Sequence, residues 1–303
     1  MTAYTALPRH MHWIESNKGE IVMKKFLSLV LAALLVLSSV SALADGITIA
    51  VPNDPTNEGR ALLLLQSAGY ITLKEDAGIT ATVLDIAENP LDIEFVEAEA
   101  AMLPNLREDV DYAIINNNYA LDAGLNPVEQ GLLIESADSP YVNVVSVKEG
   151  NEETPETKAL VAALTSQQVV NFITETYGGS AVATVENPTD GYDATVDYDA
   201  LAGTTITVCG TPVPHVEVLN IAKEILAAKG ITLDVQTVTD YVTPNLMVEA
   251  GDVYANYFAH QPYQDNFNAE NGTHVVTVAG IHVEPMALYG GKQADLTALE
   301  PAK

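Results

Sequence analysis

The chain has 303 residues, of which 48% are hydrophobic, so it is long enough to bury a core and to form two lobes of ordinary domain size. It contains 41 acidic and 13 basic residues, which gives a net charge of −28 at pH 7. Such a surface repels phosphate groups and anionic membranes, which argues against nucleic-acid binding and favours a soluble protein outside the cell. Cys209 is the sole cysteine, so neither an internal disulfide nor a zinc site built on cysteines can form.

The N-terminal region has the pattern of a leader. Met23-Lys24-Lys25 is a short basic segment, an apolar run follows it, and Ala42-Leu43-Ala44 fits a cleavage site. The run is shorter than the roughly 20 apolar residues of a membrane span, which favours a cleaved signal peptide over residues 23–44. Residues 1–22 lack hydrophobic periodicity, and we interpret them as an upstream extension. Asp45 stands where many exported binding proteins have a lipid-anchoring cysteine.

Two segments of the chain follow the same plan, in which a strand leads through a Pro-containing turn into a helix. The ranges are 47–51, 52–56 and 58–68 in the first unit, and 205–208, 210–215 and 217–229 in the second. Further strands are predicted at 111–115, 141–147 and 252–256. The pattern predicts two α/β lobes of similar construction, with ligand loops at the carboxyl ends of their strands.

The composition changes between residues 178 and 203, where Pro, Asp, Thr and Gly predominate. We interpret this segment as a linker. Its length is unusual inside a compact domain, where most connections have about 4–6 residues.

Arg60 is predicted to lie in the first turn of its helix, where the positive end of the helix dipole disfavours a cation. An anionic partner would explain its position. A ligand carboxylate could fill that role, held also by Asn57 and by free backbone N–H groups. The alternative is a salt bridge with one of the many acidic residues.

Five aromatic side chains fall between Tyr254 and Phe267, in what we expect to be a loop after the 252–256 strand. They fit either an aromatic wall for an apolar or thioether side chain or part of a lobe core. Asn116, after the 111–115 strand, could bind both charged groups of a zwitterion, or could be a turn former.

The histidines carry no metal-site signature. His215, His274 and His282 have neither a carboxylate nor a second histidine at metal-ligand spacing, so we interpret them as structural. The sequence also lacks a nucleophile elbow, a phosphate loop and a dinucleotide fingerprint, which lowers the expectation of an enzyme. We expect neither a cofactor nor a metal.

Several segments together resemble the NlpA-type methionine-binding lipoproteins of ABC importers. The first is Ala50-Val-Pro-Asn-Asp-Pro-Thr-Asn-Glu-Gly-Arg60. The others are Ser139-Pro-Tyr-Val-Asn143, Asp240-Tyr-Val-Thr-Pro-Asn245, Ala255-Asn-Tyr-Phe-Ala-His-Gln-Pro-Tyr263 and His282-Val-Glu-Pro-Met286. The resemblance covers about residues 47–289 and implies an α/β type II periplasmic-binding fold, with a ligand cleft between two lobes.

The order of these segments departs from the family, in which the aromatic segment precedes the Asn-Asp-Pro-Thr-Asn segment. The chain therefore looks circularly permuted, with the 178–203 linker joining the family's two ends. On this interpretation lobe A comprises residues 45–120 and lobe B residues 121–303. A single crossover would join them and make the hinge looser.

The resemblance implies an exported protein, not an enzyme, that captures methionine or a close analogue for an ABC permease and its ATPase. We expect a monomer. An extracellular sensor or scavenger for another apolar amino acid or a methionine dipeptide is the alternative. Arg60 and Asn57 would hold the ligand carboxylate, and Asn116 its head group. The residues expected to wall the ligand side chain are Tyr241, Phe258, His260 and Tyr263.

Overall fold

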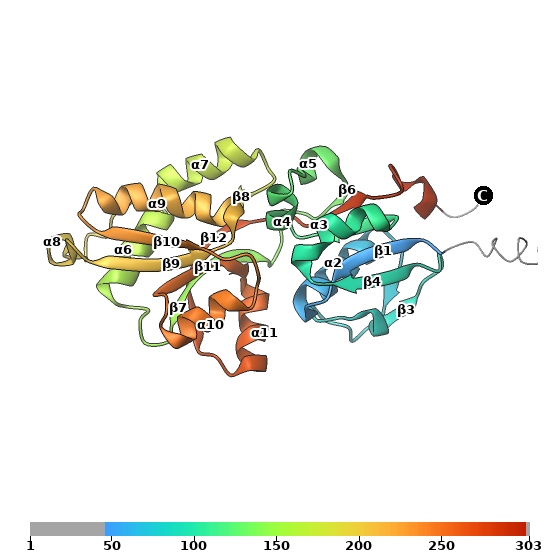
Figure 1. Cartoon of the computed structure of the whole chain (residues 1–303), viewed down its shortest axis with the longest axis horizontal. Coiled ribbons are helices and arrows are strands. Elements are labelled where there is room, and N and C mark those ends of the chain that lie inside the picture. The colour runs from blue at the N-terminus through green and yellow to red at the C-terminus, as the bar shows by residue number, and fades with distance from the viewer. Residues whose placement is uncertain (1–45, 301–303) are drawn as a thin grey trace, which may run out of the picture. The chain divides into compact units, whose positions relative to one another are not determined.

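A computed structural model describes residues 46–300, so the predicted leader and upstream extension lie outside the described residues. Two mixed β-sheets and their flanking helices make up these residues (Figure 1). The first sheet has the strand order β4 (Glu94–Ala98), β1 (Thr48–Pro52), β5 (Tyr112–Ile115), β13 (Ala287–Gly290), β6 (Gly131–Ile134). A separate two-stranded ribbon pairs β2 (Thr72–Leu73) with β3 (Ile86–Glu88).

The second sheet is the larger. Its order is β10 (Thr232–Thr237), β9 (Thr205–Gly210), β11 (Ala255–His260), β7 (Val142–Lys148), β12 (Val275–Val283), β8 (Val182–Ala183). The pairs β10–β9 and β9–β11 are parallel, whereas β7 runs antiparallel to both of its neighbours. In the first sheet β1 pairs in parallel with β4 and β5.

The longer helices begin at side-chain caps that the sequence supplies. Asp54, Thr154 and Ser166 accept hydrogen bonds from backbone N–H groups in the first turns of α2, α6 and α7. The helices are α2 (Pro55–Ser67), α3 (Leu103–Leu106), α4 (Asn117–Asp122), α5 (Pro127–Gln130), α6 (Pro155–Leu164), α7 (Gln167–Tyr177), α8 (Tyr198–Leu201), α9 (Glu217–Ala227), α10 (Thr243–Ala250) and α11 (Gln261–Asn271). Because Asp54 caps α2, this helix begins earlier than predicted, and Arg60 lies in its second turn rather than its first.

Alternating side chains of each strand pack on opposite faces of its sheet. Val208 joins the core cluster that contains α6, α7 and α9, and its neighbour Cys209 packs with Val248 of α10. In the first sheet, Ile114 and Ile115 likewise belong to two separate clusters. Helices therefore cover both faces of the six-stranded sheet (Figure 1).

The chain crosses between the two sheets twice, at residues 135–141 and 284–286. This differs from the predicted lobes at 45–120 and 121–303, and from the single crossover expected between them. Strands β6 and β13 return to the first sheet because β13 pairs with both β5 and β6. Leu288 and Leu299 are buried in the same core as Ile49. The two crossovers are also tied together, since Glu135 N–H donates to the carbonyl of Met286 at 2.9 Å.

Two segments expected to be irregular are ordered. The aromatic segment forms strand β11 and helix α11 instead of a loop, because its small and aromatic residues fit a buried central strand. The predicted linker at 178–203 contains β8 and α8. Thr189 exchanges backbone hydrogen bonds with Thr165 and Gln167, and Leu201 is buried in the large core.

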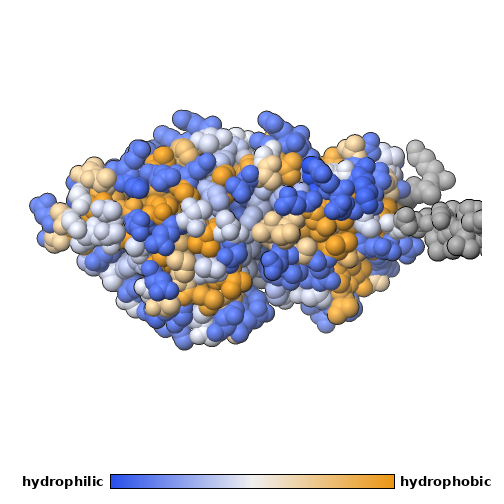
Figure 2. Space-filling view, viewed as in Figure 1, coloured by the Kyte–Doolittle hydropathy of each residue, from blue (hydrophilic) through white to orange (hydrophobic). Residues whose placement is uncertain are grey.

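The apolar side chains gather mainly in these cores. Among residues 46–300 the large apolar side chains that remain exposed are Ile79, Leu84, Met102, Val128, Ile134, Val242 and Leu246. Figure 2 shows one face, on which apolar residues lie among hydrophilic ones. No helix in the described part of the chain is long and apolar enough to cross a membrane.

Gly59 lets helix α2 lie directly against the loop at residues 78–81. A Cβ atom there would meet the carbonyl oxygen of Ile79 at 2.3 Å and the backbone nitrogen of Ala81 at 2.9 Å. Both contacts are with backbone, so relief requires the helix or the loop to shift. We expect Gly59→Ala to lower the free energy of unfolding by about 1–3 kcal/mol in urea titrations.

Gly78 in the same loop provides the matched control, because a Cβ there meets nothing within 4 Å. Gly78→Ala is expected to change the free energy of unfolding by less than about 0.5 kcal/mol. Equal effects of the two substitutions would contradict the packing argument.

Candidate functional site

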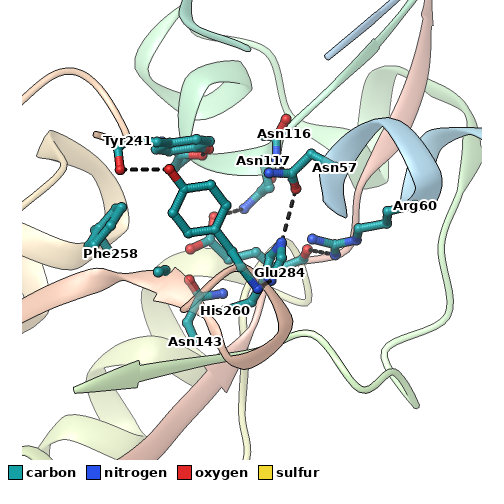
Figure 3. A pocket seen from close by; sticks show the side chains of 12 residues that line it. Asn57, Arg60, Asn116, Asn117, Asn143, Tyr241, Phe258, His260 and Glu284 are labelled. Carbon is teal, nitrogen blue, oxygen red and sulfur yellow. Dashed lines mark hydrogen bonds between the residues drawn. The ribbon is translucent and has the colours of Figure 1, made fainter. Parts of the chain in front are cut away.

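A pocket lies where strand ends from the two sheets meet (Figure 3). Its lining residues come from α2, α4, β7, β11, α11, the second crossover and the segment after β10. They are Asn57, Arg60, Asn116, Asn117, Asn118, Asn143, Tyr241, Phe258, Ala259, His260, Tyr263 and Glu284. All seven residues predicted to bind a ligand are among them.

The guanidinium of Arg60 is buried, with 4% of its side chain exposed, and most of it is bound by the protein. Its Nε donates to both carboxylate oxygens of Glu135 at 3.1 Å, and Nη2 donates to Glu135 and to the carbonyl oxygen of Glu284. The ring of Tyr141 lies 4.3 Å from the guanidinium carbon. Arg60 therefore has the anionic partner that its sequence position suggested, and this partner is a protein side chain. Nη1 alone has no hydrogen-bond partner among residues 46–300.

Asn57 and His260 link the two lobes across the pocket. His260 Nδ1 accepts the backbone N–H of Tyr263, so Nε2 carries the proton and donates to Asn57 Oδ1 at 3.0 Å. The same oxygen accepts from Asn116 Nδ2 at 2.8 Å, while Asn57 Nδ2 donates to Asp54. The amide of Asn57 is thus engaged within the protein.

Three consecutive amides at the start of α4 face the pocket with unpaired atoms. Within the described residues, Asn116 Oδ1, Asn117 Oδ1 and Asn118 Nδ2 are buried and have no hydrogen-bond partner. A buried polar group without a partner costs about 1–3 kcal/mol. The pocket therefore offers two acceptors and one donor that a polar ligand can satisfy.

The opposite wall is aromatic. Phe258 and Tyr263 lie with their ring centroids 6.0 Å apart, and Tyr241 lies within 6.0 Å of both rings. The hydroxyl of Tyr241 donates to Asn118 Oδ1 at 2.6 Å, which joins this wall to α4. The wall is apolar toward the pocket and is held in place from both lobes.

Glu284 places a buried carboxylate in the pocket wall. Its Oε1 lies 2.9 Å from His282 Nε2 and 3.2 Å from His215 Nε2, and its Oε2 accepts from Asn117 Nδ2 at 3.3 Å. Burial alone would raise the pKa of the Glu284 carboxyl, but the two histidines and Asn117 outweigh it and hold the pKa below its usual value. The interpretation of His215 and His282 as lacking a nearby carboxylate was wrong, because tertiary folding brings His215 to Glu284 and the carboxylate stands two residues after His282. His274 is exposed and lies beside Glu249.

The family model for "NlpA lipoprotein" matches residues 36–185 and 206–303, which together are well over half of the chain. The chain belongs to this family. Among curated relatives it is 42% identical over 146 residues to a "Probable D-methionine-binding lipoprotein MetQ" of Pasteurella multocida, covering 48% of this chain and 53% of that one. It is 43% identical over 148 residues to the "D-methionine-binding lipoprotein MetQ" of Escherichia coli K12, covering 48% and 55%. The chain thus spans about half the length of the curated relatives it matches.

A solved structure of a nutrient-binding protein from Burkholderia cenocepacia bound to methionine is 49% identical. The match covers 47% of this chain and 61% of that one, with a TM-score of 0.45. The interval that the NlpA family model leaves unmatched, residues 186–205, falls mostly within the segment predicted as a linker.

Several pocket residues of this NlpA family member were not predicted. Glu284 stands in the quoted His-Val-Glu-Pro-Met segment, where its position in a crossover could have indicated a site. Asn117 and Asn118 adjoin the predicted Asn116. Glu135, by contrast, meets Arg60 from 75 residues away, and no local pattern indicates that pairing.

The buried histidines make stability depend on pH. Burial lowers the pKa of His215 to about 3, and burial together with Arg60 lowers the pKa of His260 well below its usual value. In the unfolded chain both titrate near 6.5, so below that pH the unfolded state binds more protons and stability falls. Between pH 7 and 5.5 each histidine is expected to remove about 1 kcal/mol from the free energy of unfolding.

Urea titrations at the two pH values test this dependence. His215→Gln and His260→Gln are each expected to remove one histidine's share of the pH dependence, whereas the exposed His274→Gln leaves it unchanged. Comparison with the wild type cancels the contribution of the carboxylates. An undiminished pH dependence in both buried variants would contradict the assignment.

Proposed function

We propose that this protein binds methionine, or a close analogue with a free amino and carboxyl group, between its two lobes. The observation that carries the proposal is the set of unpaired groups that line one pocket. Asn118 Nδ2 is a buried donor without a partner in the described chain, and Asn116 Oδ1 and Asn117 Oδ1 are buried acceptors without one. Arg60 lines the same pocket, and in the described chain its hydrogen bonds come from Nε and Nη2. The carboxylate of Glu284 adds a negative charge. Donors of this kind suit a ligand carboxylate, and the acceptors together with Glu284 suit an ammonium group.

The aromatic wall supports a thioether side chain in the rest of the pocket. Sulfur–aromatic contacts contribute roughly 0.3–1.5 kcal/mol each, and Phe258, Tyr263 and Tyr241 all line the same space. Curated relatives named as D-methionine-binding lipoproteins support the same ligand class.

The proposed role is capture rather than chemistry. The fold is of the type II periplasmic-binding kind, in which two lobes close over a solute, and the closed face would be presented to an ABC permease with its ATPase. The predicted signal peptide supports a location outside the cytoplasm, where we propose that the protein works as a monomer. The lipoprotein relatives and the family match support an extracytoplasmic location.

Arg60→Lys tests the proposed carboxylate contact by calorimetric titration with methionine. Lysine keeps the charge beside Glu135 but loses the planar fork that presents Nη1 to the pocket. We expect the wild type to bind with micromolar or tighter affinity and the variant to bind roughly tenfold to a hundredfold more weakly. Arg107→Lys, which alters an arginine outside the pocket, is the matched control. Unchanged methionine affinity in Arg60→Lys would contradict the proposed carboxylate contact. Absence of methionine binding in the wild type would contradict the proposed ligand.

We also infer that the chain is a circular permutation of the family's arrangement. The family model matches this chain in two segments. The curated relatives named above each match over about half of both chains. An alignment that keeps residues in sequence order can match only one half at a time when the two halves are exchanged. Ile47 and Leu299 pack in one core, so the two ends of the described unit lie close together. Proximity of this kind is what permutation requires.

A chain with the family's order tests this inference. It would begin at Thr195, continue to residue 300, pass through a Gly/Ser linker of about 6 residues to residue 46, and end at Ala194, both cut positions being exposed. We expect it to fold and to bind methionine within about twofold of the wild type, because no buried contact is broken. A cut at Ser146, inside β7, is the control expected not to fold. Loss of folding in the first chain would contradict the inference.

A further inference from the structure

Glu284 has two imidazole neighbours and no cationic one. Its Oε1 accepts a hydrogen bond from the His282 ring and its Oε2 accepts one from the Asn117 amide, and its side chain is 6% exposed. Arg60 donates a hydrogen bond to the backbone carbonyl oxygen of Glu284, but its ion pair is with the carboxylate of Glu135. Among residues 46–300 no lysine or arginine forms an ion pair with the Glu284 carboxylate. One buried negative charge in the pocket is therefore compensated by hydrogen bonds alone.

The proton positions of the two imidazoles follow from their partners. Nε2 of His215 faces the Glu284 carboxylate and also Asn143 Oδ1 at 3.1 Å, and both of these oxygens can only accept. Nε2 must then carry the proton, and Nδ1 accepts from the hydroxyl of Thr211 at 2.7 Å. The low pKa of His215 agrees with a neutral ring.

His282 repeats this arrangement from the other side. Its Nε2 donates to Glu284 Oε1 at 2.9 Å, and its Nδ1 accepts from the hydroxyl of Tyr257. Tyr257 is itself fully buried, so its hydroxyl cannot donate to bulk water and donates to His282 Nδ1. Two hydroxyls thus fix the two rings: His282 points its N–H group at Glu284 Oε1, whereas His215 points its N–H group at Asn143 and lies 3.2 Å from the same carboxylate oxygen.

These rings stabilise the charge of Glu284 without cancelling it. An isolated buried carboxylate costs several kcal/mol unless it is paired and hydrogen-bonded. Neutral N–H donors supply the hydrogen bonds, and the pairing positive charge has to come from whatever enters the pocket. A cationic histidine or an arginine in their place would satisfy the carboxylate and remove the demand for a charged ligand.

We propose that His282 is a positioning residue that makes the pocket selective for a free ammonium group, acting through its hydrogen bond to Glu284. The inference rests on the proposed function and adds to it the residue that sets the preference for an unblocked amino group. N-acylated and deaminated analogues are excluded, because they leave the Glu284 charge unpaired. This is selection by an unsatisfied charge, which discriminates more strongly than pocket shape.

A metal ion is the other arrangement that two imidazoles and a carboxylate can hold, since these ligand atoms lie within 4.8 Å of one another. The protonated nitrogens favour the hydrogen-bonded arrangement. Every ring nitrogen of the pair has a partner of matching polarity at hydrogen-bond distance, and none is left to ligate a cation.

Calorimetric titration with three ligands tests the proposal: methionine, N-acetylmethionine and 4-(methylthio)butanoate, which lacks the amino group. The wild type is expected to prefer methionine by about a hundredfold or more. His282→Leu removes one donor to Glu284, and the preference is expected to fall about tenfold. His282→Gln keeps an N–H donor near the same place and is expected to recover most of the preference. His274→Leu, at an exposed histidine, is the control.

Tyr257→Phe provides a variant that removes one hydroxyl while keeping the buried ring. Without this donor, His282 is no longer fixed with its proton toward Glu284, so the preference for methionine is again expected to fall. Circular dichroism melting checks that each variant is folded.

The outcomes separate this inference from the proposed function. Failure of the wild type to bind methionine defeats the proposed function. Tight methionine binding with no preference over the two analogues defeats the inference alone, as does an undiminished preference in both Tyr257→Phe and His282→Leu. One equivalent of zinc in the purified protein, with loss of methionine binding after EDTA dialysis, would also overturn it, because a cation would then hold the imidazoles.

Discussion

The buried guanidinium of Arg60 joins the elements on which the pocket depends. From the second turn of α2 it reaches the carboxylate of Glu135 in one crossover and the carbonyl of Glu284 in the other, with the ring of Tyr141 against its face. A buried charge requires such partners, since breaking a buried pair typically costs about 3–5 kcal/mol. The same side chain therefore ties a helix of the first lobe to both connections between the lobes.

The pocket is closed by polar residues that act from both sides. The run Asn116-Asn117-Asn118 follows β5 directly, so three successive amides emerge at a strand end where the two sheets approach. One atom of each amide is bound within the protein and the other is not. The bound atoms of Asn117 and Asn118 join α4 to residues beside the second sheet, and the unbound atoms remain available to a polar ligand. The proposed ligand would therefore bind residues of both lobes at once.

The segment between residues 184 and 204, most of which the family model leaves unmatched, is held in place by specific contacts. It runs over the second lobe, with Tyr192 and Tyr198 packed edge to face and Lys229 lying over both rings. Gly191 fits tightly against Ile225, with a positive φ of +99°. These contacts restrict the conformations that the segment can adopt.

The sequence by itself determined the strand–turn–helix units, the caps that start the helices and, through the family resemblance, the seven residues that line one pocket. Local patterning suffices for these, because apolar alternation and capping depend on neighbours a few residues apart. Only the tertiary structure decided that β6 and β13 belong to the first sheet, that the lobes are joined twice, and that Glu135 and Glu284 meet Arg60. These pairings span 75 and 224 residues and depend on which strand edge is free when the sheets assemble. The alternation of apolar and polar residues predicts which face of a strand is buried, but it does not predict which sheet the strand will join.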